Sequence, residues 1–260
     1  MLTHLDLFLW ASGVVGHALL FAVLLARGRC RQFPWFTALI GANVGRSLLL
    51  YLLSSHGNPE IYRIAYWDLA LLVDGFLQLA VVLELARRVF RPLGYWAPDV
   101  RRAFLFLVGA SVIVAAALAW LAAPRALSWR DNLAVKGSFF SSALLGELLI
   151  GMIALSATVG LPWKTHVARI AQGLGLFSLL DMLIEGAHSL YGANYETEVD
   201  IGLSHTRMML YLGCLLYWIV TLWQDAPEPR ALSDEAKKHL RSLQTRLAYD
   251  LWTLRSWRRP

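Results

Sequence analysis

Long apolar stretches separated by short polar segments fill most of the 260-residue chain. A membrane-spanning helix needs roughly 20 mostly apolar residues, and seven stretches reach that length: 5–27, 34–55, 62–90, 103–123, 136–158, 167–191 and 203–223. None shows the alternation of apolar and polar residues that a membrane β-strand requires. Because lipid cannot satisfy backbone N–H and C=O groups, each stretch is predicted to be a helix that crosses the bilayer.

The predicted fold class is therefore all-α, with one seven-helix transmembrane domain over residues 1–225 and a cytoplasmic linker and amphipathic basic helix over 226–260. A segment with two prolines, Pro227 and Pro229, separates the two parts. The apolar face of the last helix is formed by Leu240, Leu243, Leu247, Leu251 and Leu254. Its basic residues and tryptophans favour docking on anionic lipid headgroups. The leucines could instead pair with a protein partner or with a second copy of this chain.

Composition and charge agree with a membrane protein. Hydrophobic residues make up 57% of the chain and the mean hydropathy is +0.51, whereas a soluble domain has roughly 45–50% apolar residues. With an external N-terminus, 18 Lys and Arg residues fall on the inner side and five on the outer side. This bias predicts an N-out, C-in orientation. The net charge of +6 then faces anionic lipid, and a nucleic-acid partner is not expected.

Ionisable residues inside the predicted spans are unusual, because each costs at least roughly 2.5–3.5 kcal/mol to insert. In the sixth span, Ser178, Asp181, Glu185 and His188 share one helical face that opens toward the external side. In the seventh span, Arg207 belongs to a second stripe, with Tyr211, Cys214 and Trp218. Such residues usually face the interior of the bundle, where they bind a ligand or hold helices together.

The second and third spans carry a further polar group. Asn43 and Arg46 share one face, and so do Asp74 and Gln78. Matching depths predict that Arg46 pairs with Asp74, with Asp68 as the second choice and Asp181 as a competitor.

Two further acids and a histidine lie in the spans. His17 and Glu147 fall near the middle of the first and fifth spans. Glu84 lies close to the inner membrane surface, where we expect it to be exposed and paired with Arg87 and Arg88.

The candidate ligand- or proton-binding residues are Arg46, Asp74, Gln78, Asp181, Glu185, His188, Arg207 and Tyr211. Catalytic residues, metal ligands and cofactors are not predicted. The chain has no HExxH spacing for zinc and no GxSxG nucleophile motif. It also has no lysine in the seventh span that could form a Schiff base with retinal.

A short internal similarity indicates a second organisation. The second span begins with Pro34-Trp35-Phe36-Thr37, and the sixth begins with Pro162-Trp163-Lys164-Thr165. When these two segments are aligned, Gly45 falls opposite Gly173. This would suit three helices, one linker helix and three helices, as in transporters built from parallel repeats.

The run 84–92, together with Tyr62, Tyr66 and Trp67, resembles a pattern in uncharacterised bacterial seven-helix membrane proteins. That resemblance implies a multi-pass protein of the bacterial inner membrane. The N-out topology with a basic cytoplasmic helix also resembles the seven-helix sensor modules of bacterial signalling proteins. The expected function is a non-enzymatic sensor or receptor-like module that binds a small ligand or a proton in a polar intramembrane cavity. The alternatives are a small-solute or proton-coupled transporter, and then an intramembrane enzyme or a structural subunit of a membrane complex.

Overall fold

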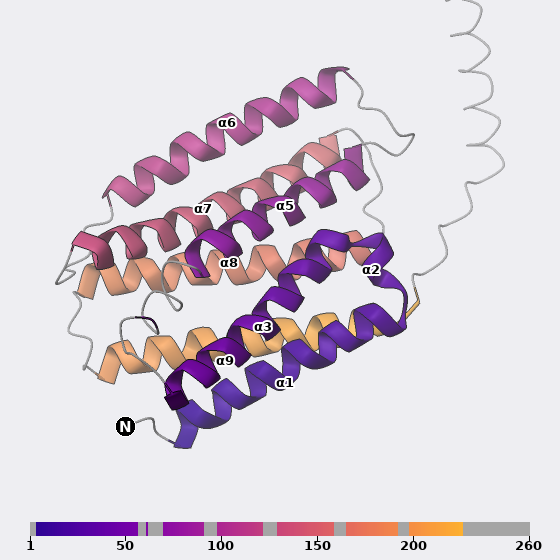
Figure 1. The fold of residues 1–260 in the computed structure, drawn as a ribbon. Coiled ribbons are helices and arrows are strands. Elements are labelled where there is room, and N and C mark those ends of the chain that lie inside the picture. The colour runs from indigo at the N-terminus through magenta and orange to yellow at the C-terminus, as the bar shows by residue number, and fades with distance from the viewer. Residues whose placement is uncertain are drawn as a thin grey trace, which may run out of the picture. The chain divides into compact units, whose positions relative to one another are not determined.

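The computed structural model describes residues 4–56, 61, 70–90, 98–121, 129–158, 165–191 and 198–225 of the chain. Within these ranges every regular element is a helix (Figure 1), which confirms the all-α class for this part of the protein. The helices are α1 (His4–Ala26), α2 (Arg29–Gln32), α3 (Pro34–His56), α5 (Ala70–Phe90), α6 (Pro98–Leu121), α7 (Trp129–Thr158), α8 (Thr165–Tyr191) and α9 (Glu198–Trp223).

Six of these helices, namely α1, α3, α6, α7, α8 and α9, are long and apolar enough to cross a membrane. The chain is therefore a multi-pass membrane protein by the length and composition of its helices. The seventh long helix, α5, is not among the six, since every segment of it long enough to span a membrane holds at least three of the residues Asp74, Glu84, Arg87 and Arg88. The predicted 62–90 span extends beyond α5 into residues 62–69, which lie outside the described part of the chain.

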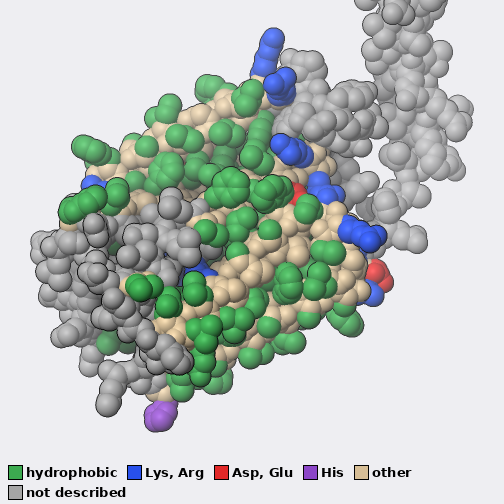
Figure 2. All heavy atoms as spheres, viewed as in Figure 1, with side chains coloured by type: hydrophobic (Ala, Val, Ile, Leu, Met, Phe, Trp, Pro, Cys, Tyr) green, Lys and Arg blue, Asp and Glu red, His purple; other side chains and the backbone are tan. Residues whose placement is uncertain are grey.

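Six helices form a closed ring. In the order α1, α3, α5, α7, α8 and α9, each helix contacts the next, and α9 returns to α1. Helix α6 lies outside this ring, packs mainly against α7, and borders the bundle in Figure 1. We call the end that holds the starts of α1 and α9 the amino end. The opposite end, where Lys and Arg side chains gather in Figure 2, is the basic end.

At the basic end the chain turns from α1 into α3 through the short helix α2, which is too short and too polar for the apolar pattern of the sequence to predict. Gly28, with a φ of 63°, provides the left-handed residue that ends α1. Pro34 then begins α3, where its missing N–H costs nothing.

Glu84 of α5 caps the start of α3 from the side. Its Oε2 accepts a hydrogen bond from the backbone N–H of Phe36 at 3.2 Å, which places a carboxylate at the positive end of the α3 dipole. The expectation that Glu84 is exposed at the membrane surface is wrong, because only 7% of it is accessible. The unsatisfied N–H groups of the first turn of α3 provide the partner that water would otherwise supply.

The outer surface is apolar and the interior is closely packed. Large exposed hydrophobic residues cover the visible face of the bundle in Figure 2, and on α6 they include Phe106, Ile113 and Trp120. Such a surface fits contact with lipid tails. Inside, the fully buried Trp218 of α9 meets Phe36 edge-on, with ring centroids 5.3 Å apart. Its indole Nε1–H donates to the Arg169 carbonyl at 3.2 Å.

Gly173 lets α8 approach the indole of Trp218. A Cβ at this position would lie under 3.0 Å from several indole atoms. The ring cannot move aside easily, because it is buried and hydrogen-bonded. Gly151 of α7 is similarly close to Leu107, but there the contact is with the methyl groups of a flexible side chain.

We expect Gly173→Ala to destabilise the protein by about 1–3 kcal/mol through overpacking, and Gly151→Ala to cost less. Gly45→Ala is the matched control, since a Cβ there meets nothing within 4 Å. Thermal unfolding of the full chain in detergent measures the three midpoints. Equal midpoints for the variants of Gly173 and Gly45 would contradict this packing.

Candidate functional site

Arg207 of α9 binds two carboxylates of α8. Its Nε lies 2.6 Å from Oδ1 of Asp181, and its Nη1 donates to Oε1 of Glu185 at 2.9 Å. The two acids are four residues apart and share a face of α8, so one guanidinium fork reaches both. The acid side chains are 4% and 10% exposed, whereas that of Arg207 is 37% exposed. Three predicted site residues from two spans therefore meet.

Ser142 of α7 extends this contact to a third helix. Its hydroxyl donates to Oδ2 of Asp181. Oδ1 of Asp181 is close to Arg207, but the angle between them does not make a directed hydrogen bond. The attraction there is therefore mainly coulombic. We call Ser142, Asp181, Glu185 and Arg207 the acid–arginine cluster. It joins α7, α8 and α9.

The cluster carries two acids and one base. If all three are ionised, one negative charge is in excess among these residues, and a buried uncompensated charge costs several kcal/mol. Glu185 has a further interaction beyond its contact with Arg207. The fourth residue predicted for this face, His188, lies outside the described side chains. The composition of the cluster suits a site that takes up a proton or a cationic group.

One turn farther along α9, Tyr211 contacts α1. Its hydroxyl lies 2.7 Å from Nε2 of His17, and Nδ1 of His17 lies 2.7 Å from the carbonyl oxygen of Gly13. A carbonyl oxygen only accepts, so Nδ1 carries the hydrogen. In the neutral ring, Nε2 then accepts the hydroxyl hydrogen of Tyr211. The Tyr211 ring also packs against Phe177 of α8, with centroids 4.8 Å apart.

The predicted set omitted His17, as it omitted Ser142. For His17 the sequence held one indication. This histidine is buried, at 6% exposure, in the middle of α1. Its position inside an apolar span was the only signal available, because its partner Tyr211 is 194 residues away. Together, the acid–arginine cluster and the His17–Tyr211 pair form a polar path that runs from α7 through α8 and α9 to α1.

The polar residues of α3 and α5 make further contacts, and the charge of Arg46 also acts on the His17 ring. Nη2 of Arg46 donates to Oδ1 of Asn43 at 2.8 Å, which confirms that these two residues share a face. Arg46 has a further interaction, but the side chain of Asp74 and all of Asp68 lie outside the described residues. The pairing of Arg46 with Asp74 therefore stays a prediction. Gln78 of α5 accepts a hydrogen bond at 3.4 Å from Ser141 of α7.

Two other polar contacts lie away from this path. Near the amino end, Nε2 of His205 lies 2.6 Å from Oδ1 of Asp6, which joins α9 to α1. Outside the ring, Ser111 of α6 hydrogen-bonds to Glu147 of α7. Among the described residues, no three His, Cys, Asp or Glu side chains converge as a metal site would require.

Comparison of the chain with known protein families, characterised proteins and solved structures found no match. The function of the protein is therefore inferred from the contacts between its own side chains.

We expect Arg207→Leu to destabilise the bundle by up to about 3 kcal/mol, because two buried carboxylates lose their base. Adding Asp181→Asn should recover part of the loss, since it removes one of the stranded charges. Thermal unfolding in detergent measures both effects. The matched control is Arg102→Leu, which removes an exposed arginine of α6. The cluster would be contradicted if the Arg207→Leu variant unfolded at the same temperature as the wild type. A further loss of stability on adding Asp181→Asn would also contradict it.

Proposed function

We propose that the chain is a seven-span protein of the bacterial inner membrane with its amino end outside. The charge distribution supports this orientation. The described arginines close to the basic end are Arg27, Arg29, Arg31, Arg87, Arg88, Arg101, Arg102 and Arg169. Positive residues accumulate on the cytoplasmic side of membrane proteins. The acid–arginine cluster then lies toward the external side of the bundle.

Within that membrane, we infer that the protein is a non-enzymatic sensor whose input is a proton or a small cationic ligand. The observation that carries this function is the double contact of Arg207 with Asp181 and Glu185. A proton or a cation that enters the cluster neutralises a carboxylate and weakens its hold on Arg207. The guanidinium is 37% exposed and the acids are buried, so entry passes beside Arg207.

The response of this sensor is a movement of α9. This helix contacts α1 through Tyr211 and His17, and α8 through Arg207 and Trp218. When the contact of Arg207 with the acids weakens, the position of α9 relative to α8 loses one of its constraints. A ligand can shift such an equilibrium only by its difference in affinity for the two positions. The cluster supplies this difference, because a cation competes with Arg207 for the same carboxylates.

Accessibility from outside tests the orientation. We expect Ser204→Cys, one turn before Arg207 on α9, to react with an impermeant maleimide added to intact cells. Cys30 and Cys214 are first replaced, so that each variant carries one thiol. Arg31→Cys at the basic end is the control and should react only after the cells are opened. The reverse labelling pattern would overturn the N-out orientation.

A proton-coupled transporter with three helices, a linker and three helices is the alternative function. The ring supports this organisation, because α6, the helix in the linker position, lies outside it. The two matched glycines differ, however. Gly173 packs against Trp218, while Gly45 has nothing within 4 Å. The halves of the ring are therefore packed differently at the best-matched positions.

Proteoliposomes distinguish the two functions. We expect acidification on the amino side to change the rate at which Cys30, near the basic end, reacts with a thiol reagent, without acidifying the lumen. Asp181→Asn with Glu185→Gln should abolish this change, because the cluster then has no carboxylate that can accept a proton. The Cys30 assay uses a Cys214→Ala background, and Asp6→Asn is the matched control. Sustained proton flux that the double variant abolishes would favour the transporter.

A further inference from the structure

Buried polar atoms without partners are concentrated at the basic end. Among the described residues, six buried side-chain nitrogen or oxygen atoms lack a hydrogen bond, and four of them lie here. They are Nε of Arg27, Nε of Arg29 and both ring nitrogens of His166. His166 is only 5% exposed. Since a buried unsatisfied polar atom costs about 1–3 kcal/mol, four at one place call for an explanation.

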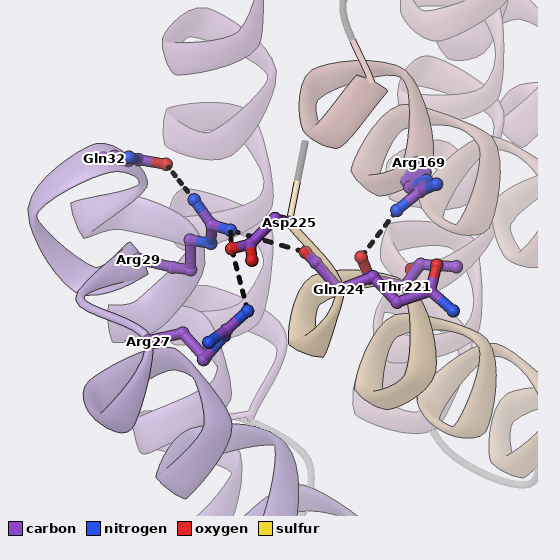
Figure 3. A network of polar contacts seen from close by, with 7 residues as sticks. All are labelled: Arg27, Arg29, Gln32, Arg169, Thr221, Gln224 and Asp225. Carbon is purple, nitrogen blue, oxygen red and sulfur yellow. Dashed lines mark hydrogen bonds and ion pairs between the residues drawn. The ribbon is translucent and has the colours of Figure 1, made fainter. Parts of the chain in front are cut away.

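The partners that Arg29 does have are weak. Its guanidinium donates to Oε1 of Gln32 at 3.3 Å, to the Gln224 carbonyl at 3.4 Å and to Oδ1 of Asp225 at 3.4 Å. Figure 3 shows these groups around the end of α9. All three distances exceed the 2.7–2.9 Å of a good charge-assisted hydrogen bond. Arg29 can therefore exchange these partners at little cost.

Capping of α9 explains only part of this arrangement. Arg169 donates to the Thr221 carbonyl at 2.7 Å, as a cation at a helix C-terminus should. The long contact of Arg29 with the Gln224 carbonyl has the same character. Capping leaves His166 unexplained, and it does not use the Nε–H of either Arg27 or Arg29.

The charge of the region favours an anion. The region holds three guanidinium groups, those of Arg27, Arg29 and Arg169, and one carboxylate, that of Asp225. Arg27 and Arg29 contact this carboxylate, whereas Arg169 donates to the Thr221 carbonyl (Figure 3). With His166 neutral, the sum is two positive charges. The charges that act on the His166 ring are those of Arg29, Arg169 and Asp225. The Asp225 side chain is 84% exposed, so it can be displaced from these bases.

We propose that Arg27, Arg29 and His166 bind a phosphate group, which takes the place of the Asp225 carboxylate. A phosphate offers several acceptor oxygens in a tetrahedral arrangement, whereas Asp225 offers two in a plane. Its oxygens would reach the Nε–H groups and an imidazole nitrogen that the carboxylate leaves unpaired. His166 lies in the first turn of α8, whose free N–H groups and dipole also favour an anion.

The phosphate can belong to an anionic lipid headgroup or to a phosphate-bearing solute, because both present the same oxygens. The position of the site at the basic end, where the apolar helices stop, gives both sources access. This binding site shares no residue with the acid–arginine cluster, and the proposal does not rest on the sensor function proposed for that cluster.

The test measures the binding of two probes to the full chain in a neutral detergent. Inorganic phosphate is titrated against thermal stability, with chloride at matched ionic strength as reference. Phosphatidylglycerol retention is measured against phosphatidylcholine by native mass spectrometry. Arg29→Gln should weaken binding about tenfold, as expected for the loss of a charge-assisted hydrogen bond. Arg31→Gln, which replaces an exposed arginine on the same short helix, should change binding less than about twofold.

Two further variants make the result decisive. Asp225→Asn should strengthen binding, because it removes the competing carboxylate. His166→Phe keeps the ring volume but removes both nitrogens, so it should weaken binding and replaces Arg29→Gln if that variant does not fold. A response to inorganic phosphate supports a solute, and retention of phosphatidylglycerol alone supports a lipid. Equal weakening by Arg29→Gln and Arg31→Gln, or equal stabilisation by chloride, overturns the site.

Discussion

A polar group inside the bundle depends on the protein itself for its partner, because the surrounding lipid offers none. This constraint accounts for most of the specific contacts between helices. Glu84 satisfies an N–H at the start of α3, Tyr211 satisfies His17, and Arg207 holds two acids. In water, each of these pairs would compete with solvent and contribute little. In the membrane they determine which helices lie side by side and in which rotation about their axes.

Helix α9 makes more polar contacts with other helices than its apolar composition suggests. Arg207, Tyr211, Cys214 and Trp218 form one stripe, and all four make contacts with other helices. The part of the stripe nearer the amino end is polar and faces α8 and α1, while the part nearer the basic end is aromatic and closes the core. If α9 is displaced near Arg207, its other end at the basic end would therefore move as well. There Arg29 and Arg169 donate hydrogen bonds to the last carbonyls of the same helix.

The sequence predicts the positions of the helices well, because the length of an apolar stretch can be read from neighbouring residues alone. Each of the seven predicted stretches corresponds to one long helix of the structure. The sequence also predicts which residues share a helical face, as Asp181 and Glu185 illustrate, because this follows from their spacing along one helix. It does not predict which residues of different helices contact each other. The capping role of Glu84 and the link between His17 and Tyr211 depend on how helices are rotated and paired, which periodicity does not encode. The arginines at the basic end follow the positive-inside pattern, and that pattern gives no indication that Nε of Arg27, Nε of Arg29 and the ring nitrogens of His166 are buried without hydrogen bonds.

The closure of the ring by α1 and α9 has a consequence for biosynthesis. Helix α9 follows all the other described helices in the chain, yet it carries the partners of residues that are inserted much earlier. While the ribosome is still making the later segments, His17 lacks its hydroxyl and the acids of α8 lack their guanidinium. The earlier helices therefore enter the bilayer before all of their polar groups have partners, and each such group raises the free energy of insertion. A nascent chain that stalls before α9 would hold Asp181 and Glu185 in the bilayer without the guanidinium of Arg207, so the incomplete bundle would be less stable than the finished one.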